Sequence, residues 1–318
     1  MKLIIQIPCY NEEHTLPQTF ADLPKSIPGI DVIETQIVDD GSDDATVEVA
    51  KRLGVTHIVS FKNNKGLAAA FRAGAENALA RGADILVNTD GDNQYFGGDI
   101  PKLVMPIVEG KADIVIGCRP IVDHPEFSEL KKLLQRMGSM VLRNISKTTV
   151  RDAASGFRAY SKNSLMHLNI YSNFSYCMET LIQAGLSNMK IDNVDIRVNP
   201  KSRDSRLFKS ITEYISRSGS TMIGIFLVYR AKKLFFVLAG LTFSVSLILF
   251  LRYMALITFF EANRGGFWPS IVLSGILLAV AVQMIFTGIL ASLVSSNRML
   301  LEDIKYRLAK MEDRQRPS

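Results

Sequence analysis

Short apolar runs alternate with amphipathic stretches along the chain as far as about residue 200. Five runs rich in β-branched side chains predict buried strands, at residues 3–7, 34–38, 57–60, 84–88 and 112–116. Stretches with helical periodicity, such as 44–53 and 66–80, lie between them. This alternation is typical of a mostly parallel α/β sheet with helices on both faces. Because ligands of such folds bind beyond the carboxyl ends of the strands, the polar residues that follow each strand are the candidates for a site.

The C-terminal part of the chain differs in character, because it holds two long runs without a charged residue. These runs cover residues 234–251 and 267–296. Each is long enough to cross the roughly 30 Å hydrocarbon core of a bilayer as a helix. Tyr253 and Trp268 stand near the ends of these runs, as membrane-interface residues do. We therefore predict a hairpin of two transmembrane helices, at about 233–257 and 268–294, against the alternative of two buried helices in a soluble core.

The basic residues around the hairpin predict its orientation. They stand outside both spans, at Arg230, Lys232 and Lys233 on one side and Arg298, Lys305, Arg307 and Lys310 on the other. Because positive flanks stay on the cytoplasmic side, we expect an integral protein of the cell (inner) membrane with its catalytic half in the cytoplasm. The first apolar run is only strand-length and stops at Pro8, so we expect no signal peptide.

Four regions follow from these patterns. We predict a catalytic domain over 1–205, two transmembrane helices within 231–297 and a basic cytoplasmic tail over 298–318. Residues 206–230 combine apolar positions at helical spacing with interspersed arginine and lysine, which predicts amphipathic helices in the membrane interface. A helix packed on the catalytic domain is the alternative for this segment.

Composition narrows the class of protein only slightly. The 318 residues are 47% hydrophobic and 21% charged, as in ordinary folded enzymes, and the net charge of +6 favours anionic partners. We expect phosphates and lipid headgroups among these partners and no nucleic acid. Cys9, Cys118 and Cys177 are far apart and odd in number, which argues against a disulfide framework or a zinc site and favours packing roles.

The most specific chemical pattern follows the run at 84–88. Asp90, Asp92 and Gln94 stand at every second position directly after a predicted strand. Two carboxylates and an amide so placed can direct their oxygens to one hard cation, and Mg²⁺ and Mn²⁺ prefer such ligands. The sequence therefore predicts a divalent metal site here.

Polar residues after the other strands suit a nucleotide. Tyr10, Asn11 and Glu12 follow the first run after Pro8 and offer an aromatic ring with hydrogen-bonding groups to a nucleoside. Asp39 and Asp40 end the second strand, where a carboxylate can accept hydrogen bonds from a ribose, although a turn with a helix cap also explains Asp40. Lys65 and Gly66 open a helix, which suits a phosphate.

In this order, the motifs resemble those of glycosyltransferase family 2. They are Pro8-x-Tyr10-Asn11-Glu12, Asp39-Asp40-Gly41-Ser42, Asn64-Lys65-Gly66 and Asp90-Gly91-Asp92-x-Gln94. Residues 152–158 and the pair Glu179-Thr180 narrow the resemblance to the subgroup related to dolichol-phosphate mannosyltransferase and to bacterial polyprenyl-phosphate glycosyltransferases. It covers residues 3–230, and the two-span hairpin matches the bacterial branch.

The resemblance implies a GT-A (Rossmann-like) α/β catalytic domain and inverting transfer of a hexose from a nucleotide-diphosphate sugar. It implies that the nucleoside is held by Pro8, Tyr10, Glu12 and Asp39, and the bridging metal by Asp90, Asp92 and Gln94. With Asn11, Asp40, Lys65 and Gly66 added, these residues form our predicted nucleotide-sugar and metal site. Cys118 departs from the family, where a polar or acidic residue is common at this position.

The acceptor implied is a polyprenyl phosphate such as undecaprenyl phosphate. A phosphate is already ionised and needs cationic positioning, for which the candidates are Arg119, Lys132, Arg136, Arg158, Arg203 and Arg206. Arg119 follows a strand end, so we count it as catalytic together with Asp92 and Asp152. A hydroxyl acceptor would instead require a general base, which Asp152 or Glu179 could supply.

Several alternatives stay open at this point. The same fold could act on a glycolipid or polysaccharide hydroxyl, or the protein could be a nucleotidyltransferase that makes the activated sugar. The resemblance to the bacterial branch favours UDP-glucose or a similar UDP-sugar as donor, with GDP-mannose open. The sequence also leaves open whether the protein is a homo-oligomer in the bilayer.

Overall fold

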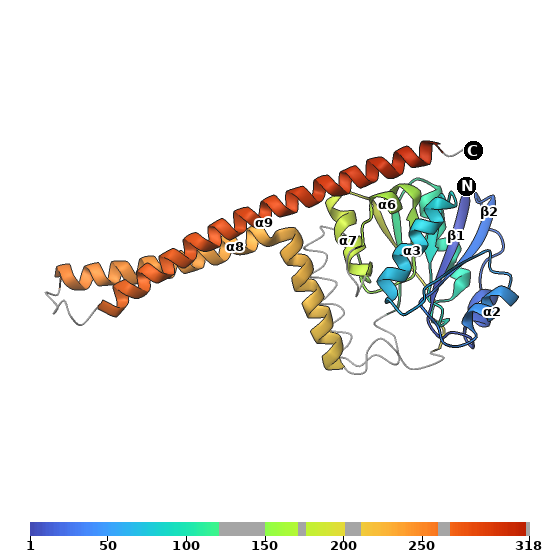
Figure 1. The fold of residues 1–318 in the computed structure, drawn as a ribbon, viewed down its shortest axis with the longest axis horizontal. Helices are drawn as coiled ribbons and strands as arrows, with labels where there is room; N and C mark the ends of the chain where they lie inside the picture. Colours follow the sequence, from blue (N-terminus) through green and yellow to red (C-terminus); the bar gives the residue numbers. More distant parts are fainter. Residues whose placement is uncertain (121–149, 171–175, 201–210, 260–267, 316–318) are drawn as a thin grey trace. The chain divides into compact units, whose positions relative to one another are not determined.

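The computed structural model describes residues 1–120, 150–170, 176–200, 211–259 and 268–315 (Figure 1). Of residues 211–230 it describes only the helical backbone. The chain divides into two compact units, one formed by Met1–Ser216 with Lys305–Ser318 and the other by Arg217–Ile304. The first is the catalytic unit and the second the hairpin unit.

Within the described residues, the catalytic unit contains one seven-stranded sheet with the order β3-β2-β1-β4-β6-β5-β7. Its strands are β1 (Lys2–Cys9), β2 (Val32–Asp39), β3 (His57–Ser60), β4 (Ile85–Asn88), β5 (Ile114–Cys118), β6 (Arg158–Ser161) and β7 (Ile191–Asp195). All neighbouring pairs are parallel except those of β6, which runs antiparallel to both β4 and β5. The predicted mostly parallel α/β sheet is confirmed, and β6 and β7 add to the five strands expected.

Helices cover both faces of this sheet. They are α1 (Leu16–Ala21), α2 (Thr46–Arg52), α3 (Leu67–Ala80), the short 3-10 helix η1 (Gly97–Asp99), α4 (Ile100–Val108), α6 (Lys162–His167) and α7 (Tyr176–Leu186). On one face, α4 packs on β4 and β5 around Leu103, Val104 and Ile107. On the other face, α3 contacts β1, β2, α6 and α7. The result is the three-layer arrangement of a GT-A-like domain.

Strand β1 lies inside the sheet between β2 and β4, and its sequence is apolar on both faces. Every side chain from Leu3 to Cys9 is buried, including that of Gln6. Gln6 donates to Asn88 Oδ1 of β4 at 3.0 Å and accepts from Gln36 of β2 at 3.2 Å. The same side chain leaves no room for a Cβ on Gly74 of α3, so the helix lies directly against the sheet.

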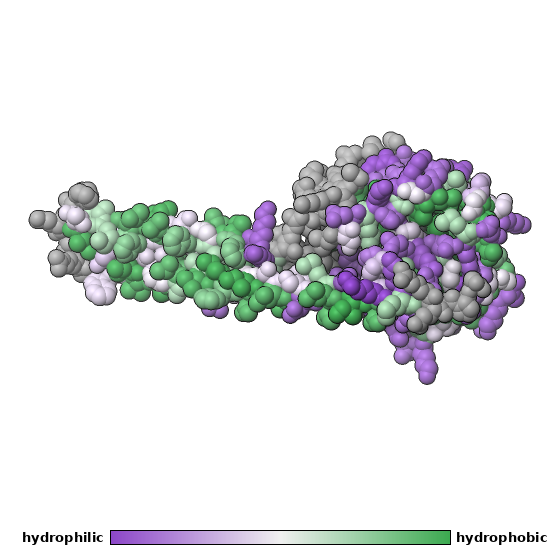
Figure 2. Space-filling view, turned by 90° about the horizontal axis from the view of Figure 1, so that it is seen from above, coloured by the Kyte–Doolittle hydropathy of each residue, from purple (hydrophilic) through white to green (hydrophobic). Residues whose placement is uncertain are grey.

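The hairpin unit consists of parts of two long helices, α8 (Ile211–Phe259) and α9 (Trp268–Gln315). Their candidate membrane spans are Ala231–Thr258 and Trp268–Asp313. Of the most apolar 18-residue stretch in each span, only 11% is buried. Large apolar side chains are exposed along both helices, with Ile248 at 64% and Val294 at 69% (Figure 2). Exposed apolar surface of this extent suits a lipid environment and not water.

Small residues form the contact between the two helices. Ser246 of α8 donates to the Ser274 carbonyl of α9 at 2.8 Å, and Ser274 donates back to the Ser246 carbonyl at 3.0 Å. Ala239 and Ala281 lie one heptad from these serines and are also buried. Small residues at this spacing allow the close helix approach that is typical of membrane hairpins.

The C-terminal turns of α9 pack on the catalytic unit. The Tyr306 ring stacks on His167 with ring centroids 3.5 Å apart, and its hydroxyl lies 3.2 Å from Asn163 Oδ1. Further along the helix, Asp313 forms an ion pair of 2.6 Å with Lys162. These turns were predicted as part of a basic tail over 298–318. They are helical to Gln315, and the predicted region boundaries otherwise remain predictions.

Replacing Tyr306 by alanine should lower the free energy of unfolding of the catalytic unit by about 1–2 kcal/mol, because it removes a ring stack and a hydrogen bond. Thermal unfolding of the purified full-length protein measures this. Tyr306→Phe is the matched control, since it keeps the stack and loses only the hydroxyl, and should fall between wild type and alanine. Equal melting temperatures for all three proteins would contradict the packing role.

Candidate active site

The carboxyl ends of β1, β2 and β4 lie side by side and bring the predicted site residues to one edge of the sheet. Cys9 at the end of β1 is in register with Asp39 at the end of β2, and Gln6 of β1 is in register with Asn88 of β4. The residues that follow these strands therefore converge, although they are far apart in the sequence.

The loop after β1 is tied to the loop after β2. Asn11, in the left-handed region at φ 56°, donates its backbone N–H to Ser42 Oγ at 2.9 Å. Glu12 donates its N–H to Thr46 Oγ1 at 2.8 Å, and its buried carboxylate accepts from Thr15 at 2.6 Å. Tyr10 is 36% exposed, so its ring is accessible for stacking, whereas Pro8 is buried in β1. The predicted nucleoside contacts of these residues remain predictions.

Asp40 joins the second and third predicted motifs. One of its carboxylate oxygens accepts from Lys65 N at 2.7 Å and the other from Gly66 N at 2.9 Å. Burial raises the pKa of this carboxyl, although the two N–H donors and Lys65 lower it. Asp40 thus shapes the start of α3. The Asp39 carboxylate accepts from Ser42 N at 3.0 Å, and its predicted role in ribose binding remains a prediction.

The loop after β4 carries the predicted metal ligands. Asp90, Asp92 and Gln94 are all partly exposed, and Asp92 Oδ1 accepts from Gln94 N at 3.1 Å. Gly91 lies so close to β1 that an added Cβ would be 3.1 Å from Cys9 Sγ. This close approach holds the loop that carries Asp90 and Asp92 against the end of β1.

The donor set of this loop fits a hard divalent cation. Among the described residues no cluster of three or more histidine, cysteine, aspartate or glutamate side chains forms a metal cage. Two carboxylates and an amide leave coordination positions for phosphate oxygens and water, which is how Mg²⁺ is commonly bound beside a nucleotide.

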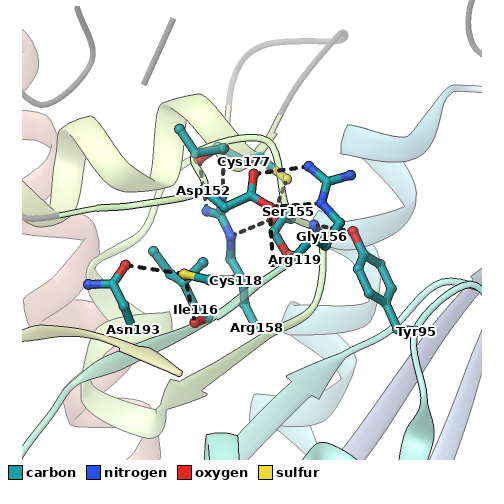
Figure 3. Close-up of polar contacts among 11 residues, drawn as sticks. Tyr95, Ile116, Cys118, Arg119, Asp152, Ser155, Gly156, Arg158, Cys177 and Asn193 are labelled. Atoms are coloured by element: carbon teal, nitrogen blue, oxygen red, sulfur yellow. Dashed lines mark hydrogen bonds and ion pairs between the residues drawn. The ribbon is translucent and has the colours of Figure 1, made fainter. Parts of the chain in front are cut away.

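Among the residues predicted for the acceptor side, Arg119 and Asp152 form a bidentate ion pair (Figure 3). Arg119 Nε donates to Asp152 Oδ2 at 2.7 Å, and Nη2 donates to Oδ1 at 2.9 Å. Asp152 is 1% exposed, whereas the Arg119 side chain is 17% exposed. Although burial alone would lower the pKa of Arg119, the nearby Tyr95, Asp152 and Asp90 raise it, so the guanidinium stays charged. The structure thus pairs two predicted catalytic residues.

The structure corrects the prediction that Arg158 contacts an acceptor phosphate. Its side chain is fully buried, and its guanidinium donates to three backbone carbonyls, those of Ala153, Ser155 and Cys177, and to Thr180 Oγ1 (Figure 3). Arg158 therefore holds the loop that carries Asp152. The other predicted phosphate ligands, Lys132, Arg136, Arg203 and Arg206, lie outside the described residues.

Two tyrosines that the sequence analysis did not single out meet Gly156 of the 152–158 motif at this site. Gly156 donates its N–H to the Tyr95 hydroxyl at 3.1 Å, and its carbonyl accepts from Tyr176 at 3.2 Å. Burial raises the pKa of Tyr95, so the hydroxyl is neutral. The signal in the sequence that could have identified Tyr95 was its position directly after the predicted metal motif. Nothing in the sequence distinguished Tyr176 from a core aromatic residue.

The three cysteines are buried thiols, in agreement with the packing roles predicted for them. Burial raises the pKa of Cys9 and Cys177, and it raises the pKa of Cys118 to about 11. Cys118 Sγ lies 3.6 Å from Asn193 Oδ1 of β7 (Figure 3). A thiol with a raised pKa at this position is a poor nucleophile.

This geometry defines a GT-A-like domain, and comparison with known proteins agrees. Glucosyl-3-phosphoglycerate synthase from Mycobacterium tuberculosis superposes with a TM-score of 0.52 at 19% identity, over 69% of this chain and 80% of that one. A second structure of that enzyme, with Mg²⁺ and UDP, gives a TM-score of 0.51 at 20% identity, over 69% of this chain and 79% of that one. At this identity the likeness shows the fold alone.

The model of glycosyl transferase family 2 matches residues 4–168, and the chain belongs to this family. A UDP-N-acetylglucosamine–dolichyl-phosphate N-acetylglucosaminyltransferase of Methanococcus voltae is 29% identical over 248 residues, which cover 70% of this chain and 92% of the relative. A dodecaprenyl-phosphate galacturonate synthase of Rhizobium johnstonii is 25% identical over 310 residues, covering 93% and 88%. The chain is therefore a glycosyltransferase that resembles the polyprenyl-phosphate sugar transferases, as the motifs predicted.

Proposed function

We propose that the protein transfers a hexose from a nucleotide-diphosphate sugar, UDP-glucose or a similar donor, to a polyprenyl phosphate such as undecaprenyl phosphate. The observation that carries this proposal is the position of the Arg119–Asp152 pair beside the carboxylate loop of Asp90 and Asp92. A cationic side chain next to a metal-binding loop suits the meeting of two phosphate groups. The similarity to transferases that act on lipid phosphates supports the same acceptor class.

On the donor side, Asp90, Asp92 and Gln94 would hold Mg²⁺ or Mn²⁺. The cation would neutralise the charge that builds up on the departing nucleoside diphosphate. Tyr10 and Asp39 would hold the nucleoside, while Asp40 fixes the backbone around Lys65 and Gly66 from which a phosphate is reached. We expect a single displacement without a covalent intermediate. Such a displacement would invert the configuration at the sugar.

On the acceptor side, no strong base is required, because a phosphate oxygen is ionised at neutral pH and attacks directly. Asp152 fits this chemistry, since both of its carboxylate oxygens accept from Arg119 and it orients the guanidinium. The positive charge of Arg119 would offset the repulsion between the incoming phosphate and the diphosphate. Arg119 is thus the residue that we expect to touch the acceptor.

The membrane hairpin fits an acceptor that stays in the bilayer. With Arg230, Lys232 and Lys233 before the first span and further basic residues after the second, the positive-inside rule places both flanks in the cytoplasm. The catalytic unit would then work at the cytoplasmic face of the inner membrane, where a polyprenyl phosphate presents its headgroup.

The direct test is transfer of radiolabelled sugar into organic-extractable lipid by the purified full-length protein. A panel of UDP- and GDP-sugars is offered with undecaprenyl phosphate, with undecaprenol or with diacylglycerol, each with Mn²⁺ or with a chelator. We expect label in the lipid phase only when undecaprenyl phosphate and the metal are both present. Label that enters the alcohols equally well would contradict the phosphate acceptor, and transfer in the chelator would contradict the metal.

A further inference from the structure

One hydrogen bond joins the donor-side loop to the acceptor-side loop. The Tyr95 hydroxyl accepts from the backbone N–H of Gly156 at 3.1 Å (Figure 3). Tyr95 directly follows the predicted metal ligands, whereas Gly156 lies between Asp152 and Arg158 in the acceptor-side loop. The contact therefore crosses the site between its two halves.

Tyr95 is held so firmly that its hydroxyl has a defined position. Its backbone forms an antiparallel bridge with Val198, and the carbonyl of the preceding Gln94 accepts from Asn199 N at 2.8 Å. Its ring stacks on Phe157 with centroids 5.1 Å apart at 18°, and the residue is 5% exposed. Because both the backbone and the ring of Tyr95 are held in place, its hydroxyl can hold the backbone N–H that it binds in one position.

Gly156 contacts residues in both halves of the site. Its carbonyl accepts from Asn88 Nδ2 at 3.1 Å, and Asn88 is the last residue of β4 before the metal loop. An added Cβ on Gly156 would lie 3.2 Å from Asp90 Oδ1, so the backbone here is in contact with that carboxylate. Gly156 is also two residues from Arg158, whose guanidinium donates to the carbonyls of Ser155 and Ala153 in the Asp152 loop.

We propose that Tyr95 is a positioning residue whose hydroxyl sets the distance between Asp90 on the donor side and the Arg119–Asp152 pair on the acceptor side. This inference rests on the proposed function. Because a diphosphate and a phosphate must be brought together against their repulsion, a displacement of one half relative to the other slows transfer. Neither half loses its own ligands, so the binding of each substrate alone is retained.

Tyr95→Phe tests this, because it keeps the ring and its stack and removes only the hydroxyl. We expect the kcat for transfer to undecaprenyl phosphate to fall by about tenfold or more, since small misplacements of reacting groups have effects of that size. The KM for each substrate should change by less than about twofold. Hydrolysis of the donor by water, which does not use the acceptor side, should be retained, so the ratio of transfer to hydrolysis falls.

Tyr306→Phe is the matched control, since it also removes one tyrosine hydroxyl that forms a hydrogen bond, here with Asn163 Oδ1 of α6 at 3.2 Å. It should leave the ratio of transfer to hydrolysis unchanged. An unchanged ratio of transfer to hydrolysis in Tyr95→Phe would overturn the inference. Equal losses of both rates with a lower melting temperature are the form of that result that a merely structural role produces. If wild-type protein transfers no sugar to lipid, the proposed function fails and this inference fails with it.

Discussion

Asp92→Asn should lower the rate of sugar transfer by about a thousandfold, because it removes one of the two negative charges that we expect to hold the metal. The substitution is nearly isosteric, and an asparagine oxygen can still accept the Gln94 N–H that Asp92 Oδ1 accepts at 3.1 Å. The loop should therefore keep its shape. Steady-state rates at several Mn²⁺ concentrations measure the effect, and the concentration that gives half-maximal rate should rise.

The matched control is Asp192→Asn, which removes an exposed carboxylate from β7 at the edge of the sheet. It should leave the rate and the metal requirement unchanged. Calorimetric titration of Mn²⁺ in the presence of UDP gives a readout independent of turnover. The assignment of the metal site would be wrong if the Asp92→Asn enzyme bound Mn²⁺ with wild-type affinity and transferred sugar within threefold of the wild-type rate.

Arg158→Met should lower the free energy of unfolding by about 3–5 kcal/mol, the second large effect that we expect. The substitution removes the guanidinium from the buried carbonyls of Ala153, Ser155 and Cys177, of which the last two keep only weaker donors, Cys177 Sγ and Thr180 Oγ1. Buried polar groups that lose partners are strongly destabilising. In a unit of this size the melting temperature should fall by about 10 °C. Thermal unfolding of the purified protein, followed by circular dichroism, measures this.

Two further variants sharpen the result for Arg158. Arg158→Lys keeps the charge but not the planar fork, so it should recover only part of the loss. Arg81→Met removes an exposed arginine at the end of α3 and should change the stability by less than about 0.5 kcal/mol. If Arg158→Met melted like Arg81→Met, the role of Arg158 as the internal support of the acceptor loop would be wrong.

The strands that the sequence predicted are those with continuous apolar runs. β1 and β4 are nearly all apolar where they are buried, and β2 has the buried pair Ile37 and Val38 near its end, so the apolar pattern alone located them. β6 and β7 were missed for different reasons. β6 is only four residues long and begins with the charged Arg158. β7 has only two apolar residues, Ile191 and Val194, which are three positions apart and so do not give the alternation of a strand.

The site was predictable where its residues are close in the sequence. Asp90, Asp92 and Gln94 form one motif after one strand, and the structure places them together. The pairing of Arg119 with Asp152 joins residues 33 positions apart, and no local pattern encodes such a contact. Arg158 was misassigned because arginine is seldom fully buried, and only the three-dimensional arrangement of carbonyls around it explains why this one is.

The burial of all three native thiols makes the protein suitable for site-directed labelling without further engineering. Because burial raises the pKa of each of them and shields it from solvent, an impermeant maleimide should leave the folded wild-type protein unmodified. A single cysteine introduced between the two spans, for example at Ala262, and another at the exposed Lys111 would then be the only reactive positions. A comparison of labelling in intact and permeabilised cells would then show on which side of the membrane each introduced cysteine lies. The three native cysteines can stay in place for this experiment.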